Sequence, residues 1–310
     1  MNGRFSIGSL LCVILLATML SSACATTLTS TPTLEPTATQ VPPPTAIPSP
    51  TAISVHLLSK SPELILVTNK PYRYSSVPDN LVYAMPGMDK VLLANELQYY
   101  DDLIVDIYYP PGYKFETKLP VVILSHGLTD VAPNDLDKDM GSQMDWAKLI
   151  AVSGMIAVSA QAGYKPVENS YYVFDFLAAN ADLLGLDLSR IGFWACSGQG
   201  IPVFWALQDK DNPNRDAFKA AVFPYLNFDF ADPSAWPKNI SLFVVKAGQD
   251  KNISGIDMDN FVAEARSNNI PTEYIELADA IHGFDTFQDT QASKDTVQQA
   301  LEFFKSKLLQ

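Results

Sequence analysis

One eleven-residue stretch carries the side chain best suited to covalent chemistry. Residues 190–200 read RIGFWACSGQG, an apolar run followed by small residues around Ser197 and then by the start of a helical pattern. A sharp strand-to-helix turn presents a serine hydroxyl for attack and crowds the positions two before and two after it, where glycine is usual. Here Ala195 and Gln199 occupy those positions, with a glycine on each side of Gln199. The pattern predicts a nucleophile at Ser197; an ordinary turn between a strand and a helix is the alternative.

A serine nucleophile needs a base, and the chain has three histidines. His56 lies in the N-terminal segment, and we predict no chemical role for it. His126 and Gly127 directly follow the apolar run 121–124, a setting in which a His-Gly pair is typical of an oxyanion-hole loop. His282 lies in the segment AIHGFD, after a predicted strand. His282 is therefore the candidate base.

The third member of such an arrangement is a carboxylate that orients the imidazole and stabilises its charged form. Asp250 follows the predicted strand 241–247, so we expect it at the edge where parallel sheets place their sites. Asp229 and Asp232, which follow the preceding strand, are the alternatives. With Asp250 the chain order is serine, aspartate, histidine, which is the order of the α/β-hydrolase arrangement.

Around these residues, apolar strand-like runs alternate with segments of helical spacing. The expected strands are 64–67, 91–97, 103–109, 121–124, 155–160, 190–196, 220–225, 241–247 and 272–277. The expected helices are 140–152, 171–184, 201–207, 258–266 and 295–309. This alternation predicts one α/β domain with a mostly parallel central sheet and helices on both faces. We expect no large lid, because the insertion near the site, 227–237, is short.

Residues 103–309 resemble the α/β-hydrolase superfamily, and within it the dienelactone-hydrolase-like serine esterases. The resemblance is carried by DIYYPPG at 106–112, SHG at 125–127, the RIGFWACSGQG segment, AGQD ending at Asp250 and HGF starting at His282. These motifs are specific for the fold and for serine-hydrolase chemistry, and they say little about the substrate.

The resemblance implies a role for each of the candidate residues. Ser197 attacks the substrate, His282 moves the proton and Asp250 orients the imidazole. The backbone N–H groups of Gly198 and Leu128 form the oxyanion hole, because donors placed where negative charge develops stabilise the transition state. The residues expected to line the site are His126, Gly127, Gln199 and Tyr164.

The cysteine beside Ser197 gives the same segment a second interpretation. In dienelactone hydrolases proper the nucleophile is a cysteine, and with Cys196 in that role Gly198 falls two residues later. That register places the bulky Trp194 at the crowded position two residues before the nucleophile. We therefore favour Ser197, with Cys196 as the alternative nucleophile and otherwise a buried packing residue.

Composition excludes some classes of function. The 310 residues are 47% hydrophobic and 18% charged, and the formal net charge is −13. This acidity argues against nucleic-acid binding, which needs a basic face, and favours a monomer through self-repulsion. The acidic run 135–139 has Met140 and Trp146 where a calcium loop has glycine and glutamate. We therefore expect a solvated acidic loop there, and neither a metal nor a cofactor.

The N-terminus has the pattern of an export signal. Arg4 precedes an apolar run at 7–20 and small residues at 21–25, a secretory pattern. Ala23-Cys24-Ala25 fits the A-x-A pattern of ordinary signal peptidase, whereas the segment ending at Cys24 resembles a bacterial lipobox whose cysteine becomes the lipidated first residue. Ser21 departs from the lipobox pattern, which has leucine there. We expect export, with lipidation at Cys24 as the favoured form.

The segment after Cys24 is rich in residues that do not form a core. Residues 26–54 contain nine Thr, three Ser and seven Pro, a composition that favours extended polyproline II. We predict a signal peptide at 1–24, a disordered Thr/Pro-rich tether at 25–60 and a hydrolase domain at 61–310. Contact with a membrane is expected only through the lipid anchor.

Together these observations predict an exported serine hydrolase that cleaves small or surface-presented carboxylic esters through an acyl-enzyme on Ser197. Two alternatives remain at this point. One is a peptidase or amidase that uses the same three residues. The other is a catalytically silent hydrolase fold that acts as a binding module.

Overall fold

A computed structural model describes residues 55–70, 80–125, 137–161, 163 and 166–310. The predicted signal peptide and most of the predicted tether lie outside these residues. Within the described part, no helix is both long enough and apolar enough to cross a membrane.

The described chain is built on a nine-stranded sheet with the order β1-β2-β3-β5-β4-β6-β7-β8-β9. The pairs from β1 to β5 along this order are antiparallel, and the remaining pairs are parallel. The strands are β1 (Ile65–Leu66), β2 (Leu92–Tyr100), β3 (Leu103–Tyr109), β4 (Leu119–Leu124), β5 (Ile156–Ala160), β6 (Leu186–Trp194), β7 (Phe218–Pro224), β8 (Ser241–Ala247) and β9 (Thr272–Leu277).

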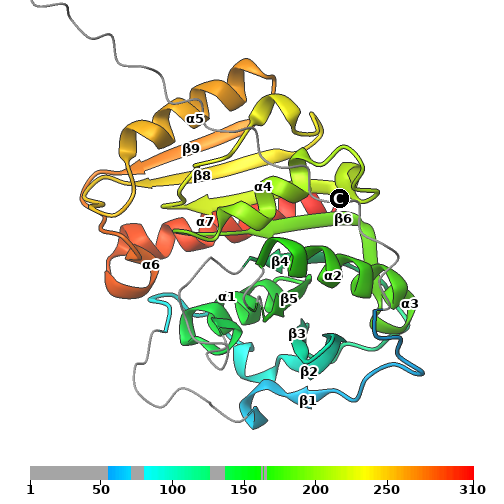
Figure 1. Ribbon diagram of the computed structural model, residues 1–310. Helices are drawn as coiled ribbons and strands as arrows, with labels where there is room; N and C mark the ends of the chain where they lie inside the picture. The colour runs from blue at the N-terminus through cyan, green and yellow to red at the C-terminus, as the bar shows by residue number, and fades with distance from the viewer. Residues whose placement is uncertain (1–54, 71–79, 126–136, 162, 164–165) are drawn as a thin grey trace, which may run out of the picture. The chain divides into compact units, whose positions relative to one another are not determined.

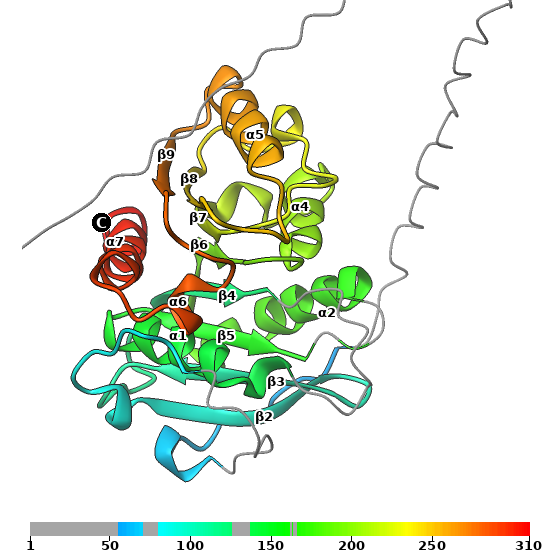
Figure 2. The same ribbon diagram turned by 90° about the vertical axis from the view of Figure 1, so that its left-hand side faces the viewer.

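Helices cover both faces of this sheet, as Figures 1 and 2 show. The α-helices are α1 (Gly141–Val152), α2 (Pro166–Ala179), α3 (Ala181–Leu184), α4 (Gly200–Gln208), α5 (Gly255–Ser267), α6 (Phe284–Phe287) and α7 (Gln291–Leu308). Helices α1 and α7 pack on one face, and α2, α4 and α5 pack on the other. The segment between β7 and β8 holds one short 3-10 turn, Pro233–Ala235.

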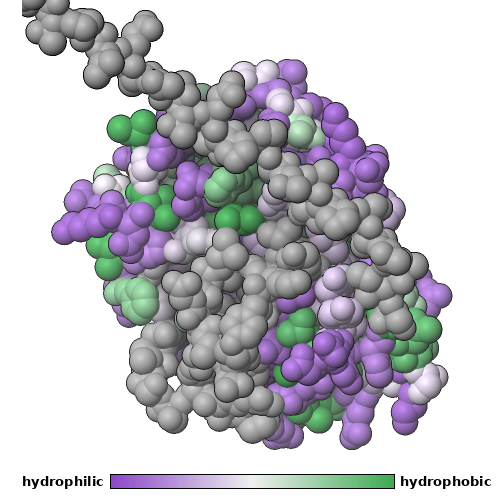
Figure 3. Space-filling view, viewed as in Figure 1, coloured by the Kyte–Doolittle hydropathy of each residue, from purple (hydrophilic) through white to green (hydrophobic). Residues whose placement is uncertain are grey.

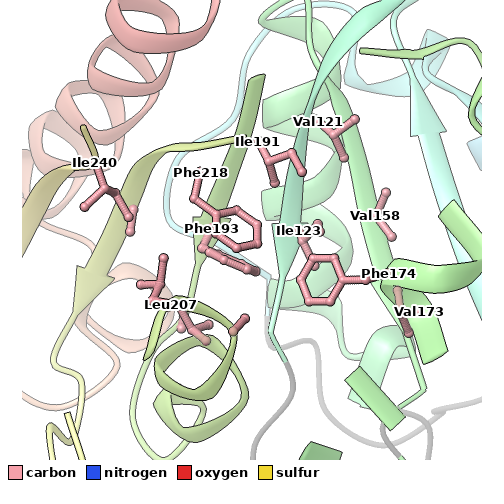
Figure 4. Packing of buried hydrophobic residues seen from close by; sticks show 14 of the residues in the cluster. Val121, Ile123, Val158, Val173, Phe174, Ile191, Phe193, Leu207, Phe218 and Ile240 are labelled. Carbon is pink, nitrogen blue, oxygen red and sulfur yellow. The ribbon is translucent and has the colours of Figure 1, made fainter. Parts of the chain in front are cut away.

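Apolar side chains fill the space between the sheet and each helical layer. On the α2 and α4 face, Ile123 of β4 and Phe193 of β6 point toward Phe174 of α2 (Figure 4). The rings of Phe174 and Phe193 meet edge to face with centroids 5.9 Å apart. The strands carry apolar residues on both sides because both faces of a parallel sheet are covered.

The strand order reverses beside β4, which lies between β5 and β6. In open α/β sheets ligands bind in the crevice outside the carboxyl ends of the strands at such a reversal. Ser125 follows β4 and Ser197 follows β6, and the Ser125 N–H donates to the Trp194 carbonyl at 2.9 Å. The topology therefore places the predicted nucleophile at the crevice.

The predicted architecture is confirmed, with one helix divided in two. The bounds of β3, β8 and β9 coincide with the predicted strands. The predicted helix 171–184 instead ends at Ala179 and resumes as α3, with Asn180 between the two helices. The Asn180 side chain accepts from the Leu58 N–H at 2.8 Å and donates to the His56 carbonyl at 3.0 Å. These bonds attach residues of the predicted tether to the domain at the point where the helix is divided.

The acidic loop predicted at 135–139 is not solvated at its end. Lys138 and Asp139 are buried and form an ion cluster with Lys70 and with Asp106 of β3. The Lys138 ammonium lies 2.8 Å from Asp106 and 2.9 Å from Asp139, and Lys70 lies 2.6 Å from Asp139. The expectation of a solvated loop was wrong for these two residues, because opposite charges from distant segments neutralise them.

Candidate active site

The chain makes a strained turn at Ser197, between the end of β6 and the start of α4. Ser197 has a φ of 52°, in the left-handed region that non-glycine residues rarely adopt. Such a conformation costs about 1–3 kcal/mol and persists only where the surroundings enforce it. Its N–H donates to the Tyr225 carbonyl at 3.1 Å, and its carbonyl accepts from the Asn227 N–H at 2.8 Å. The segment after β7 thus holds the serine backbone in place.

Ser197, His282 and Asp250 form one hydrogen-bonded chain. The Nε2 of His282 lies 3.0 Å from the Ser197 Oγ, and its Nδ1 lies 2.8 Å from the Asp250 Oδ2. Because a carboxylate only accepts, Nδ1 carries a proton, and in the neutral imidazole Nε2 then accepts from the serine hydroxyl. The other Asp250 oxygen accepts from the N–H groups of Asn252 and Ile253 at 2.7 and 3.1 Å. These bonds fix both the imidazole and the carboxylate.

The segments that carry Asp250 and His282 are joined directly. The Gly248 N–H donates to the Leu277 carbonyl and the Gln249 N–H to the Ala280 carbonyl, each at 2.8 Å. A Cβ on Gly248 would lie 2.5 Å from the Ala278 carbonyl oxygen, so only glycine allows this approach. The approach of the two segments brings the aspartate and the histidine within hydrogen-bonding distance although they are far apart in the sequence.

The structure brings neither alternative carboxylate to His282. Asp229 accepts from the Asn227 side chain at 3.1 Å. Asp232 caps the short 3-10 turn by accepting from the Ser234 N–H at 3.0 Å. The carboxylate beside the imidazole is therefore Asp250.

The thiol of Cys196 is poorly placed for nucleophilic attack. The residue is half-buried, and its Sγ lies 3.5 Å from the Gln199 Oε1, on the side-chain amide. Burial, and next the Asp285 carboxylate, raise the pKa of this thiol. Since the thiolate is the reactive form, a protonated Cys196 is a weak nucleophile.

The two predicted site residues after Ser197 differ in their surroundings. Gly198 is exposed, with open space where a side chain would be. Gln199 turns its side chain back to the Cys196 N–H at 3.4 Å, while its carbonyl accepts from the Ser125 hydroxyl at 2.8 Å. Gln199 therefore stabilises the turn through its side chain and links it to the end of β4 through its carbonyl.

A small apolar cavity of about 50 Å³ lies between α2, α4 and the ends of β4 and β5. Its walls include Phe174, Phe193 and Val203, with Ser125 and Gln161 among its polar members. Ser125 connects this cavity to the serine turn through its bond to Gln199. Pockets of this kind bury apolar parts of small ligands.

Two buried polar residues near His282 were not anticipated from the sequence. The Tyr225 ring meets the His282 ring edge-on with centroids 4.9 Å apart, and its hydroxyl donates to Asp285 at 2.6 Å. Their positions held a signal, since Tyr225 ends a predicted strand and Asp285 lies three residues after the candidate base. The remaining predicted residues, Cys24, His126, Gly127, Leu128 and Tyr164, lie outside the described residues.

The arrangement is suited to nucleophilic attack by a hydroxyl group. An imidazole nitrogen 3.0 Å from the Ser197 Oγ is within reach of the serine proton, and a carboxylate beside an imidazole can stabilise its charged form. Within the described residues, no group of three or more His, Cys, Asp or Glu side chains is arranged to hold a metal ion.

Comparison with known proteins gives a match in structure only. No protein-family model and no curated protein matches the sequence. The described fold is similar to solved structures of Est2, a thermophilic esterase from the planctomycete Thermogutta terrifontis. The native form aligns with a TM-score of 0.54 at 16% identity, over 71% of this chain and 94% of that one.

Two other Est2 structures give similar values. The form phosphonylated by sarin aligns with a TM-score of 0.53 at 15% identity, over 66% of this chain and 90% of that one. The propionate-bound form aligns with a TM-score of 0.54 at 17% identity, over 71% and 96% of the two chains. At such identities the similarity concerns the fold, and together with the strand order it shows that this chain has the α/β-hydrolase fold.

Proposed function

We propose that this protein is a serine esterase that hydrolyses carboxylic esters. The observation that carries the proposal is the hydrogen-bonded chain from Ser197 through His282 to Asp250, with the serine held in a left-handed turn at the carboxyl edge of the sheet. Among serine hydrolases, the motifs favour the dienelactone-hydrolase-like esterases.

The proposed reaction has two halves. The Ser197 oxygen attacks the ester carbonyl carbon while the His282 Nε2 accepts the serine proton. The tetrahedral intermediate then collapses, and His282 returns the proton to the departing alcohol, leaving an acyl group on Ser197. A water molecule, deprotonated by His282, attacks this acyl-enzyme and releases the acid. The backbone N–H groups of Gly198 and Leu128 are the proposed donors to the oxyanion.

The cavity between α2 and α4 supports an apolar acyl group as part of the substrate. Its aromatic and aliphatic walls lie beside the serine turn, to which Ser125 connects them. The structural neighbour Est2 has been solved with propionate and with butyrate bound, and phosphorylated by paraoxon. These forms of Est2 support an acyl ester and a reactive serine for the present chain.

Hydrolysis of a p-nitrophenyl ester series from acetate to decanoate tests the proposal, with the full chain, Ser197→Ala and Cys196→Ala compared. We expect Ser197→Ala to lower kcat/KM by about 10³-fold or more, because it removes the attacking atom. Cys196→Ala should stay within about threefold of the unmodified chain, because the thiol is protonated and plays no part in the reaction. The acyl length that gives the highest kcat/KM indicates how long an acyl chain the cavity accepts.

Three other outcomes contradict the proposal. Loss of activity only in Cys196→Ala assigns the chemistry to the cysteine. Hydrolysis of amides or peptides but not esters makes the protein a peptidase or amidase. A folded protein inactive on all of these substrates is a binding module.

We further propose that the protein is exported and anchored to a membrane by a lipid on Cys24, with the domain held at a distance by the Thr/Pro-rich segment. The support is the sequence pattern at 4–25 and the composition of residues 26–54. In that setting the substrate is an ester outside the cytoplasm, either small or presented on a surface.

A further inference from the structure

Tyr225 connects the serine turn to the histidine. It has a φ of 38°, again in the left-handed region, and its N–H donates to the Val245 carbonyl of β8 at 2.8 Å. Its own carbonyl accepts from the Ser197 N–H, while its ring meets the His282 ring at 61°. One residue therefore contacts both the nucleophile's backbone and the base.

The hydroxyl of Tyr225 leads to a buried carboxylate. Asp285, which is 1% exposed, accepts from Tyr225 at 2.6 Å through one oxygen and from the Trp146 Nε1 at 2.9 Å through the other. Acceptance at both oxygens is the bonding expected of an ionised carboxylate. Burial raises the pKa of Asp285 above its usual value, although the bonds from Tyr225 and Trp146 lower it in part.

We propose that Tyr225 and Asp285 are positioning residues that hold His282 in line with Ser197, and that the Asp285 carboxylate favours the charged imidazole formed when His282 takes the serine proton. This inference rests on the proposed esterase function. Tyr225 sets the distance between the serine turn and the imidazole. Asp285 holds the tyrosine ring in place through its hydrogen bond to the Tyr225 hydroxyl. In addition, the carboxylate places a second negative charge on the far side of that ring.

Several titratable groups surround this unit, and the test must separate their effects. Asp250 from the end of β8 faces the imidazole on one side. The groups on the other side are Tyr225 from the end of β7, Asp285 from α6 and Cys196 from the end of β6; helix α1 contributes only the neutral Trp146. A negative charge near an imidazole favours its protonated form and raises its pKa. Removing the Asp285 charge should therefore disfavour the protonated imidazole.

The test compares the full chain with Asp285→Asn and Tyr225→Phe, using kinetics and an NMR titration of the His282 imidazole. For Asp285→Asn we expect the imidazole signals of His282 to titrate at lower pH than in the unmodified chain, because a nearby negative charge is lost. The acid limb of kcat/KM should move down with it, since only neutral His282 acts as a base. In both variants kcat should fall about tenfold or more through loss of alignment, with KM within about twofold.

Tyr109→Phe is the matched control, because Tyr109 is also buried and donates its hydroxyl, to the Leu184 carbonyl at 3.2 Å. It should keep the kcat and the His282 titration of the unmodified chain. A folded Asp285→Asn with an unchanged His282 titration overturns the proposal, as does a Tyr225→Phe with unchanged kcat. The titration needs no substrate, so it stays decisive even if the unmodified chain hydrolyses no ester, which would refute the proposed function alone.

Discussion

The turn at Ser197 is enforced by close packing around Gly200, the first residue of α4. A Cβ at Gly200 would lie 2.5 Å from the Phe204 ring and 3.0 Å from the Asn227 carbonyl oxygen. Asn227 is also the residue that donates to the Ser197 carbonyl. The crowded position of this turn is therefore three residues after the serine, and Gln199 fits one residue earlier because its side chain folds back over Cys196.

Gly200→Ala should destabilise the protein, although alanine normally favours a helix by up to about 1 kcal/mol over glycine. The added methyl must displace the buried Phe204 ring, and we expect a loss of about 1–3 kcal/mol in unfolding free energy. Urea denaturation measures it. Gly198→Ala is the matched control, since its Cβ would meet nothing within 4 Å. Equal stability of the two variants would show that the turn is not crowded at Gly200.

Among the elements, the buried ion cluster joins three separate segments. Lys70 follows the 3-10 turn Val67–Asn69, Asp106 lies in β3, and Lys138 and Asp139 immediately precede α1. Burial would raise the pKa of Asp139, but its bonds and charge interactions with the two lysines outweigh burial and lower it. Its contribution to stability is therefore complete at neutral pH and is lost as the pH falls below about 4 and through the lowered pKa.

Lys138→Met should cost about 3–5 kcal/mol in unfolding free energy at neutral pH, because it leaves the cluster with an uncompensated buried negative charge. Lys118→Met is the matched control, since the Lys118–Asp182 pair is exposed and should contribute nothing measurable. Thermal and urea denaturation of both variants check this. A loss no larger for Lys138→Met than for Lys118→Met would mean that water enters the cluster and screens it.

The sequence predicted those elements whose pattern is local. β8 and β9 are apolar segments bounded by turn residues, and their limits follow from that pattern alone. The side chain of Asn180, where the helix is divided, bonds His56 and Leu58, more than a hundred positions away, and helical spacing cannot reveal such contacts. In the site, Ser197, Asp250 and His282 belong to recognisable motifs. Tyr225 and Asp285 gain their importance only from contacts that the fold creates.

At the scale of the whole molecule, the net charge bears on the proposed lipid anchor. The chain carries a net charge of −13, and hydrophilic residues make up most of the described surface on the face seen in Figure 3. Such a domain is repelled by an anionic membrane surface. A covalent lipid together with a stiff proline-rich segment would keep it near the membrane without requiring adsorption.

The lipid anchor is tested by Cys24→Ser in a bacterial host, followed by fractionation and mass spectrometry of the mature N-terminus. We expect the unmodified protein in the membrane fraction with a lipidated Cys24 as its first residue, because a free secreted form lacks the acyl chains needed for stable anchoring. The variant should leave that fraction. An unmodified protein that begins at Thr26 would instead show ordinary signal-peptidase cleavage.

The position of Cys196 has a practical consequence. It is the one free thiol among the described residues, and its backbone neighbours the left-handed Ser197. Because burial raises the pKa of this thiol, a thiol reagent should modify it slowly in the folded chain, and faster labelling in native buffer then reports local opening. The labelling rate of Cys196 therefore reports how often the turn opens, and it can be measured without substrate. A variant that labels faster but keeps its free energy of unfolding has lost local rigidity and not global stability.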